Sequence, residues 1–267
     1  MEITYYVADP AGNMTGLVQT VLPRSMYRDI STFLLENNDH QLEQIGFMEE
    51  CADCAGHLEM MGGEFCGNAA RSFGLFTVSR TDSGAEKNGA KKVGIRISGA
   101  ADVLEVMADP AEQTAQIQMP AIRSMDLVET TSYGRIPLVM MEGISHALVI
   151  DKAIDKPAAE ALIRELAQHC DSDAIGIMYY DSAENFMTPL VWVKSTNTYV
   201  WESSCGSGSC ALASWLKQAD PGEWKIQFNE PGGILAVSGT ADKKLFLGGP
   251  VKLTGPFRAE LPKEFEV

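Results

Sequence analysis

The chain has 267 residues, which is enough for one large domain or two small ones. It carries 36 acidic and 21 basic side chains, and the net charge of −15 excludes a protein that binds nucleic acid through a broad basic surface. A hydrophobic fraction of 45% and a charged fraction of 21% are typical of a folded globular protein and exclude intrinsic disorder.

The chain shows no signal for a membrane or for export. No apolar run approaches the roughly 18 residues of a membrane-spanning helix. The first residues, MEITYYVADPAGN, lack the basic segment and apolar run of a secretory signal. We therefore expect a cytoplasmic protein without a membrane partner. Its six cysteines are too few for a disulfide scaffold, and in a reducing compartment we expect them as thiols.

Helical and strand periodicities both occur along the chain. Apolar residues at helical spacing predict helices over residues 26–35 and 158–167. Alternating β-branched and polar residues predict half-buried strands over 93–97, 103–106 and 234–237.

Two cysteine segments resemble each other: EFCGNAARSF around Cys66 and SSCGSGSCAL around Cys205. In each, Cys-Gly and a small polar residue lead into a helix-compatible run and then three strand-like stretches, and such a repeat dictates architecture. We predict an α+β fold of two pseudo-symmetric lobes, residues 1–121 with Cys66 and 122–267 with Cys205. The last strand could return to the first lobe, and the site would lie between the lobes.

The residues that follow each cysteine indicate a chemical role. Small residues let the backbone approach a ligand, and a helix start directs free N–H groups and a positive dipole end toward it. That arrangement is expected to lower a thiol pKa and to bind a carboxylate. A single cysteine beside glycine is most often a small buried residue. The matched pair instead favours removal of a proton beside a carboxylate on one face and its return on the other.

The other cysteines give weaker signals. Cys51 and Cys54 form Cys-x-x-Cys with His57 three residues later, but no second ligand pair follows at zinc-finger spacing, so we expect no metal. Cys170 and Cys210 fall at predicted helices and are expected to pack. The glycine-rich segments lack the Gly-Lys-Ser/Thr ending of a nucleotide triphosphate loop and a full dinucleotide fingerprint.

The cysteine segments resemble those of the diaminopimelate epimerase superfamily, cofactor-independent racemases and epimerases in which each of two mirror-related lobes supplies one catalytic cysteine. The run ending at Asn13 and Met14 is similar to the family's early Gly-Asn motif, EQIGF with Gln44 resembles its glutamine-bearing strand, and Ser145-His146 resembles the end of its Gly-Asn-Pro-His motif. The runs GNMT, EQIGF, GGEFCGNA, QMP, WESSCGSGS and PGG are most similar to the histidine racemases of opine-type metallophore pathways.

The resemblance implies a fold in which each lobe is a curved, mostly antiparallel sheet around a central helix. It implies racemisation of an amino acid, foremost histidine, with Cys66 and Cys205 as two bases and no cofactor. Four backbone N–H groups would hold the substrate carboxylate: those of Gly67, Asn68, Gly206 and Ser207. The resemblance assigns four side chains to the substrate α-ammonium and its surroundings: Glu202, Asn13, Glu43 and Gln44. Each of these, taken alone, is more often structural.

Departures from the epimerase pattern concern the substrate's side chain. Epimerases of the lysine pathway hold a second, distal carboxylate with three asparagines and an arginine. Counting from Cys66 without gaps places His57 at the first asparagine position, and Ile144 and Ala174 occupy the other two. Ser203, directly after Glu202, stands where the family has the arginine. A second carboxylate buried without partners costs several kcal/mol. We therefore expect a substrate with one carboxylate and a neutral or cationic side chain, with His57 among the residues that bind it.

Two alternatives remain open. One is another enzyme of the same architecture: a diaminopimelate epimerase, a hydroxyproline epimerase or an isomerase of the phenazine-pathway type, which has an acidic residue where Cys66 stands. The other is a non-catalytic amino-acid-binding module, against which the presence of both thiols argues. We expect an amino acid as the partner molecule and no nucleic acid, and a homodimer is left open.

Overall fold

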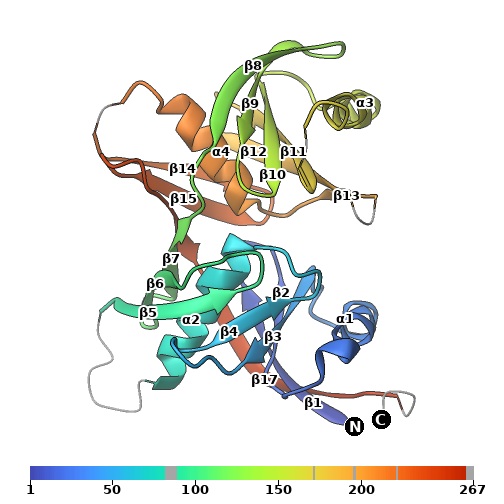
Figure 1. The fold of residues 1–267 in the computed structure, drawn as a ribbon, viewed down its shortest axis with the longest axis vertical. Coiled ribbons are helices and arrows are strands. Elements are labelled where there is room, and N and C mark those ends of the chain that lie inside the picture. Colours follow the sequence, from blue (N-terminus) through green and yellow to red (C-terminus); the bar gives the residue numbers. More distant parts are fainter. Residues whose placement is uncertain (82–88, 171, 195–196, 221, 263–267) are drawn as a thin grey trace. The chain divides into compact units, whose positions relative to one another are not determined.

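The computed structural model of the chain describes residues 1–81, 89–170, 172–194, 197–220 and 222–262. It divides into two compact units: unit 1 comprises Met1–Gln118 with Gly248–Val267, and unit 2 comprises Met119–Leu247. Figure 1 labels the helices and strands of both. Within the described residues, no helix is long and apolar enough to cross a membrane.

Unit 1 contains a mixed sheet. Its strands are β1 (Glu2–Asp9), β2 (Thr15–Val18), β3 (Gln44–Glu49), β4 (His57–Met60), β5 (Lys91–Ile97), β6 (Leu104–Asp109), β7 (Thr114–Met119) and β17 (Lys252–Glu260). Hydrogen bonding gives the order β7–β6–β5–β4–β3–β2–β1–β17. The pairs β2–β3 and β4–β5 are parallel. The last strand of the chain thus pairs with the first.

Two helices of unit 1 differ in how they are buried. A short 3-10 turn (Arg24–Met26) leads into α1 (Tyr27–Glu36), which is amphipathic and buries Ile30 and Leu34. The Tyr27 ring stacks on Phe47 of β3 with 3.7 Å between ring centroids. In contrast, α2 (Gly67–Thr81) is buried along residues 67–78 and packs against β5 and β6 (Figure 1). A helix buried on all sides is a central element.

Unit 2 also contains both parallel and antiparallel strand pairs. Its strands are β8 (Ser124–Thr130), β9 (Gly134–Met140), β10 (Ile144–Ile150), β11 (Ala174–Asp181), β12 (Phe186–Val193), β13 (Thr198–Trp201), β14 (Trp224–Glu230) and β15 (Gly233–Gly239), followed by β16 (Leu245–Pro250). β8 to β12 pair in chain order, β12 also pairs with β13 and β14, and β14 pairs with β15. The pairs β10–β11 and β12–β14 are parallel.

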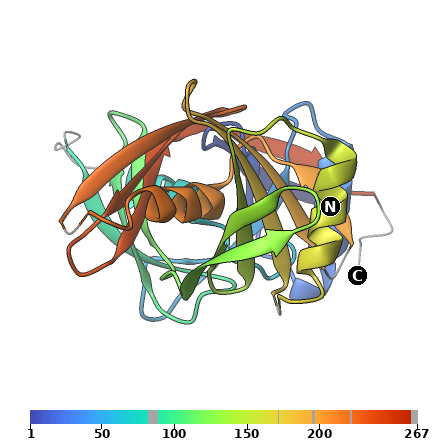
Figure 2. The same ribbon diagram turned by 90° about the horizontal axis from the view of Figure 1, so that it is seen from above.

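The helices of unit 2 cover opposite faces of its sheet. Asp155 caps α3 (Lys156–Leu166) by accepting a hydrogen bond from the Ala158 N–H, and the helix packs on β11. α4 (Gly206–Leu216) is buried along most of its length and lies inside the curve of the strands, as Figure 2 shows. Gly208 permits this close approach, because a Cβ atom there would lie 2.1 Å from the Met178 sulfur.

Most of the described strand pairs are antiparallel, as expected, and four pairs are parallel. Each of the four helices lies between strands that pair in parallel: α1 between β2 and β3, α2 between β4 and β5, α3 between β10 and β11, and α4 between β12 and β14. Parallel neighbours need a long crossover connection, which is usually a helix. The same helices that the sequence indicates therefore make the sheets mixed.

Most of the elements predicted from the sequence are confirmed. Helices α1 and α3 lie over residues 26–35 and 158–167, and β5 and β15 lie over the first and last predicted strands. β6 begins at Leu104, because Val103 is outside the ladder and 39% exposed. The order of one helix and three strands after each cysteine is also confirmed.

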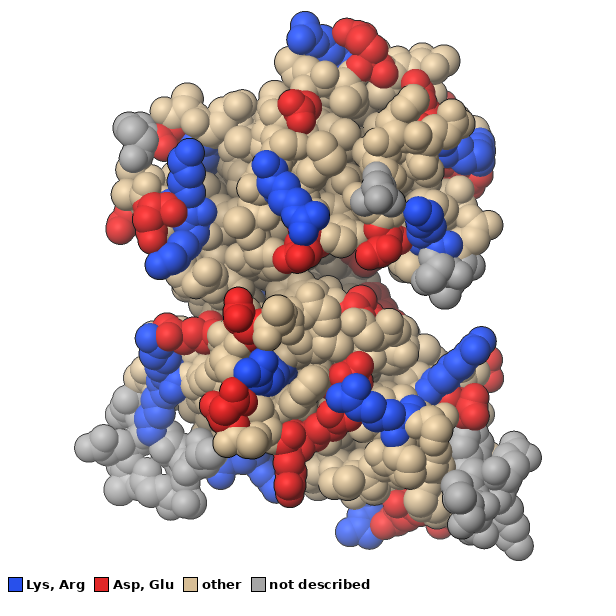
Figure 3. Space-filling view, viewed as in Figure 1, with Lys and Arg blue, Asp and Glu red and all other residues tan. Residues whose placement is uncertain are grey.

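Charged side chains of both signs are interspersed on the face drawn in Figure 3. Described ion pairs include Arg96 with Asp53 at 2.7 Å and Arg258 with Glu2 at 3.1 Å. On this face, the described residues form no broad basic patch, in keeping with a net charge of −15.

The packing of α2 generates a first prediction. A Cβ atom on Gly74 would lie 2.5 Å from Cγ1 of the fully buried Val106. Gly74→Val is therefore expected to lower the free energy of unfolding by about 2 kcal/mol through overpacking. Urea denaturation measures this change. Gly222→Val is the control, since no atom lies within 4 Å of its Cβ position. Equal stability of the two variants would contradict the described approach of α2 to β6.

Candidate functional site

Each predicted catalytic cysteine stands immediately before a central helix. The Cys66 carbonyl accepts from the Ala70 N–H at 2.9 Å, and the Cys205 carbonyl accepts from the Ser209 N–H at 2.9 Å. Both residues therefore occupy the N-cap position of their helix. The first N–H groups of each helix, including the four predicted carboxylate ligands, consequently stand next to a thiol.

A polar network in unit 1 surrounds Cys66. Its sulfur accepts from the Ala69 N–H at 3.4 Å and lies 3.9 Å from the Asn13 side-chain oxygen. Asn13 donates to the Glu43 carboxylate at 2.9 Å and accepts from the Gln44 amide at 2.6 Å. The structure thus brings together four predicted site residues: Asn13, Glu43, Gln44 and Cys66.

Thr15 is a further member of this network that the sequence did not indicate. It is fully buried, accepts from the Gln44 amide at 2.8 Å and donates to the Asn13 carbonyl at 3.0 Å. Its hydroxyl therefore fixes the orientation of both amide-bearing residues. Thr15 begins β2, two residues after Asn13. Its place beside the Gly-Asn motif was the feature of the sequence that could have identified it.

Arg71 is a second residue that the sequence analysis missed. Its side chain is fully buried in α2, five residues after Cys66. The guanidinium donates to the Asn68 side-chain oxygen at 3.1 Å, to the Pro10 carbonyl at 3.0 Å and to the Pro250 carbonyl at 2.9 Å. It ties the start of α2 to the loop that carries Asn13. An arginine among small residues of a buried helix was its sequence signal.

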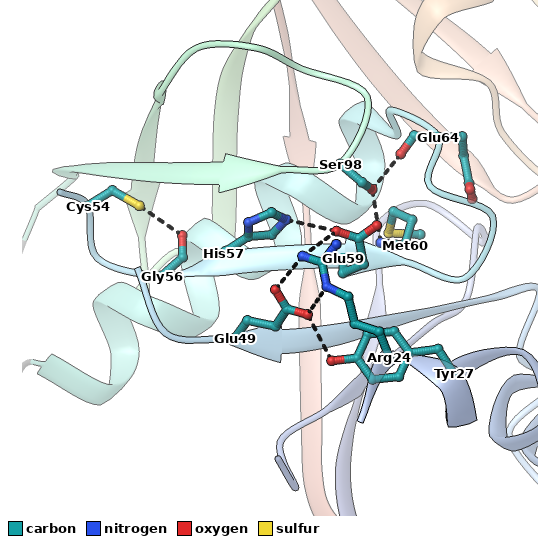
Figure 4. Close-up of polar contacts among 10 residues, drawn as sticks. All are labelled: Arg24, Tyr27, Glu49, Cys54, Gly56, His57, Glu59, Met60, Glu64 and Ser98. Atoms are coloured by element: carbon teal, nitrogen blue, oxygen red, sulfur yellow. Dashed lines mark hydrogen bonds and ion pairs between the residues drawn. The ribbon is translucent and has the colours of Figure 1, made fainter. Parts of the chain in front are cut away.

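The loop that leads to Cys66 is held at both ends by Ser98. Figure 4 shows the Ser98 hydroxyl accepting from the Met60 N–H at 2.9 Å and donating to the Glu64 carbonyl at 2.8 Å. Gly99 follows with φ of +74°, and a Cβ atom there would lie 2.3 Å from the Phe65 backbone nitrogen. The tight turn after β5 thus supports the backbone immediately before the thiol.

The structure separates His57 from these residues. His57 pairs with Glu49 across β3 and β4, and Glu49 lies five residues along β3 from Gln44. At about 3.3 Å per residue, that separation is roughly 16 Å. The structure therefore does not bring His57 together with Asn13 and Gln44, and its role in substrate binding stays a prediction.

His57 belongs instead to an ion-pair network on the β3–β4 hairpin (Figure 4). Arg24 contacts the carboxylates of Glu49 at 2.7 Å and Glu59 at 3.0 Å, and the His57 ring lies 3.2 Å from Glu59. The hydrogen bond from Arg24 holds the pKa of the Glu49 carboxyl below its ordinary value. This network links the 3-10 turn before α1 to the sheet.

Two cysteines expected as thiols are joined instead. Cys51 and Cys54 form a disulfide across the β3–β4 connection. Their Cα atoms lie 5.4 Å apart, within the range that a disulfide spans, because the intervening residues turn tightly. Cys66, Cys170, Cys205 and Cys210 are free, and the last three are buried. Packing roles for Cys170 and Cys210 are consistent with that burial.

In unit 2, Cys205 is 6% exposed and has an extended backbone. Its sulfur lies 3.6 Å from the Ser207 hydroxyl, and its N–H donates to the Glu230 carboxylate at 2.7 Å. Glu202, which follows β13, also faces the thiol. The structure thus groups Glu202, Cys205 and Ser207, and it adds Glu230, which the sequence analysis missed.

The expected lowering of the thiol pKa at a helix start is wrong for Cys205. Burial raises the pKa of this thiol well above its ordinary value, and the Glu202 and Glu230 carboxylates raise it further. The Gly208 N–H at the helix start acts in the opposite direction. Desolvation and two neighbouring carboxylates therefore outweigh the helix start.

Three of the four residues expected to replace the epimerase's distal-carboxylate ligands lie in unit 2: Ile144, Ala174 and Ser203. Ile144 and Ala174 are directly paired at the start of β10 and β11. The Ser203 carbonyl accepts from the Gly232 N–H at 2.7 Å. Trp201 packs against the core of this unit and stacks on Tyr179, with 6.0 Å between ring centroids. Ile144 and Ala174 therefore place apolar side chains side by side at one end of the sheet.

His146 generates a prediction about pH. The ring is fully buried and neither of its nitrogens has a hydrogen-bond partner among the described residues. Burial lowers the pKa of His146 from 6.5 to about 3. Below pH 6.5 the unfolded chain binds a proton that the folded chain excludes, and stability falls as the pH falls. This residue is expected to remove about 1.4 kcal/mol of unfolding free energy per pH unit below pH 6.

Urea denaturation of His146→Leu at several pH values between 7 and 5 tests that expectation. The variant should show a flatter dependence on pH than the wild-type protein. His169→Leu replaces an exposed histidine and should keep the wild-type slope. A wild-type slope in His146→Leu would show that the imidazole is accessible to protons in the folded state.

The fold has known counterparts among solved structures. A PhzF-family phenazine biosynthesis protein of Enterococcus faecalis matches with a TM-score of 0.65 and 16% identity, covering 98% of this chain and 100% of that one. A PhzF-family protein of Bacillus anthracis matches with a TM-score of 0.69 and 12% identity, covering 98% and 99%. The chain therefore has the fold of the PhzF and diaminopimelate epimerase-like isomerases.

Relatives in sequence define the family. A histidine racemase of Fusobacterium nucleatum is 32% identical over 254 residues, which is 92% of each chain, and one of Staphylococcus aureus is 27% identical over 242 residues, which is 86% of each. The model of the histidine racemase CntK N-terminal domain matches residues 2–253. The chain belongs to this family and is an isomerase.

Proposed function

We propose that the protein is a histidine racemase that interconverts L- and D-histidine without a cofactor. The observation that carries this proposal is the similarity to histidine racemases over 92% of the chain, which includes both N-cap cysteines. The resemblance to racemases of opine-type metallophore pathways supports a role for the D-histidine product as a building block of such a molecule.

Two thiols supply the acid and the base. A thiolate removes the α-proton and becomes a thiol, while the other cysteine gives its proton to the opposite face of the carbanion and becomes a thiolate. One proton enters the substrate and one leaves it, so the reaction is balanced. In this mechanism Cys66 serves one face of the α-carbon and Cys205 serves the other.

The helix starts would stabilise the negative charge that develops during the reaction. N–H groups in the first turn of a helix have no acceptor within the helix, and they favour an anion. We assign the substrate carboxylate to the N–H groups of Gly67, Asn68, Gly206 and Ser207. Charge from the carbanion spreads onto that carboxylate in the transition state, where fixed donors have their largest effect.

Side chains beside the thiols would hold the α-ammonium. We assign it to the Glu202 carboxylate, with Asn13, Glu43 and Gln44 as the polar surroundings in unit 1. The Asn13–Glu43 and Gln44–Asn13 hydrogen bonds at 2.9 and 2.6 Å support this assignment, because they fix the side chains in advance of binding.

The proposal predicts that each thiol is indispensable. Cys66→Ser and Cys205→Ser are expected to lower kcat by about 10²- to 10⁴-fold, since serine is a far weaker acid and base at neutral pH. Loss of optical rotation of L-histidine measures the rate, and circular dichroism checks the fold. Cys170→Ala, at a buried cysteine outside the proposed mechanism, should keep most of the activity. Wild-type turnover in either serine variant would exclude the two-base mechanism.

Substrate choice gives a second prediction. L-Histidine should be racemised with a kcat/KM about a hundredfold or more above that for diaminopimelate, because an unpaired second carboxylate costs about 3 kcal/mol. Both constants are measured with the same enzyme preparation. A preference for diaminopimelate would reject the substrate and leave the cysteine chemistry standing. Binding of histidine without deuterium uptake at its α-carbon in heavy water would instead identify a binding module.

A further inference from the structure

A buried carboxylate occupies the start of the Cys205 helix. Glu230 ends β14 and is 4% exposed. One of its oxygens accepts from the Cys205 N–H at 2.7 Å, and the other accepts from the Ser209 hydroxyl. These contacts lie on the N-cap residue and in the first turn of α4. Glu230 therefore fixes the cysteine backbone and places a negative charge beside the thiol.

The surroundings of Cys205 in unit 2 favour a proton on the sulfur. The charged groups that act on this thiol are Glu202, from the segment after β13, and Glu230, from β14. Both are carboxylates, and a like charge nearby disfavours a thiolate. The Gly208 N–H opposes them, and the Ser207 hydroxyl lies 3.6 Å away and can donate or accept. Burial disfavours the thiolate as well.

The start of the other central helix has the opposite buried charge. Arg71 is fully buried in α2, where it donates to the Asn68 side chain in the first turn. The Ala69 N–H donates to the Cys66 sulfur at 3.4 Å. The buried cation and the N–H donor favour a negative charge at that end of the helix, and the Glu43 carboxylate, which accepts from Asn13 at 2.9 Å, opposes them.

We propose that Glu230 is a positioning residue that keeps Cys205 protonated in the free protein, so that Cys205 enters the reaction as the proton donor and Cys66 as the base. This inference rests on the proposed racemisation. During turnover the Cys205 proton passes to the carbanion and the substrate proton passes to Cys66. The resulting Cys205 thiolate faces two carboxylates, so proton exchange with solvent returns the pair to its starting form.

The decisive variant is Glu230→Gln, which removes the charge and keeps the shape. The glutamine oxygen can accept from the Cys205 N–H, and its amide can donate to the Ser209 hydroxyl. Glu223→Gln is the matched control, because Glu223 is exposed and lies just before the same strand. Both variants are made in the full chain.

Titration by NMR of protein labelled with ¹³Cβ-cysteine reads the thiol directly, with Cys205→Ser used to assign the resonance. In the wild-type protein the Cys205 midpoint should lie above about 8.5, the ordinary value for cysteine. Glu230→Gln should lower that midpoint by about one pH unit or more, and Glu223→Gln should leave it unchanged. The alkaline limb of kcat/KM, which reports the coupled pair of thiols, should move with it in both directions of the reaction.

Two results would overturn the proposal. One is a wild-type midpoint at or below the ordinary value, which requires no variant to fold. The other is a Glu230→Gln protein whose kcat or stability falls while the midpoint and the alkaline limb stay in place, as a purely structural role would require. Because the NMR titration needs no turnover, it distinguishes failure of this inference from failure of the proposed racemase function.

Discussion

The structure depends on one constraint: Cys66 and Cys205 must each cap the start of a helix that is buried along most of its length. The carbonyl of the cysteine accepts the first helical hydrogen bond, and its side chain stays beside the free N–H groups of the helix start. A buried helix must satisfy its polar side chains internally, as Arg71 does, and be slim where strands approach. Gly74 beside Val106 and Gly208 beside Met178 meet that requirement. Small residues in both helices therefore have a packing role.

Burial of these helices also explains the mixed sheets. A helix that connects two neighbouring strands makes them parallel, and the curved strands then enclose α2 and α4. The outer helices α1 and α3 carry apolar residues on one face and cover the other side of their sheets. β11 is accordingly buried on both faces, with Ile175 and Ile177 in the α3 core and Met178 against α4. Such a strand has a continuous apolar sequence, as AIGIMYY does.

Helices and strands could be predicted from local sequence patterns. Contacts between residues far apart in the chain could not. Periodicity located α1, α3, β5 and β15, and the repeated Cys-Gly segments located both helix starts. Arg71 and Glu230 escaped because a buried charge is recognisable only through its partners. Pro250 is 179 residues from Arg71, and Cys205 is 25 residues from Glu230. The place of His57 opposite Glu49 was equally out of reach, since strand register, and not sequence distance from Cys66, determines where a hairpin residue lies.

The buried charges of Arg71 and Glu230 raise the question of which kinetic constants of a racemase can differ between the L-to-D and the D-to-L direction. Enantiomers have equal free energy in water, so kcat/KM must be the same for both at equilibrium, whatever the protonation of the enzyme. A charge such as that of Glu230 cannot change this ratio. It can change which protonation form of the free protein is populated. The separate values of kcat and KM for each enantiomer then change, while kcat/KM stays equal for the two enantiomers. The opposite buried charges of Arg71 and Glu230 could therefore act only on the separate kinetic constants, and the fixed ratio of kcat/KM requires no symmetry between the two helix starts.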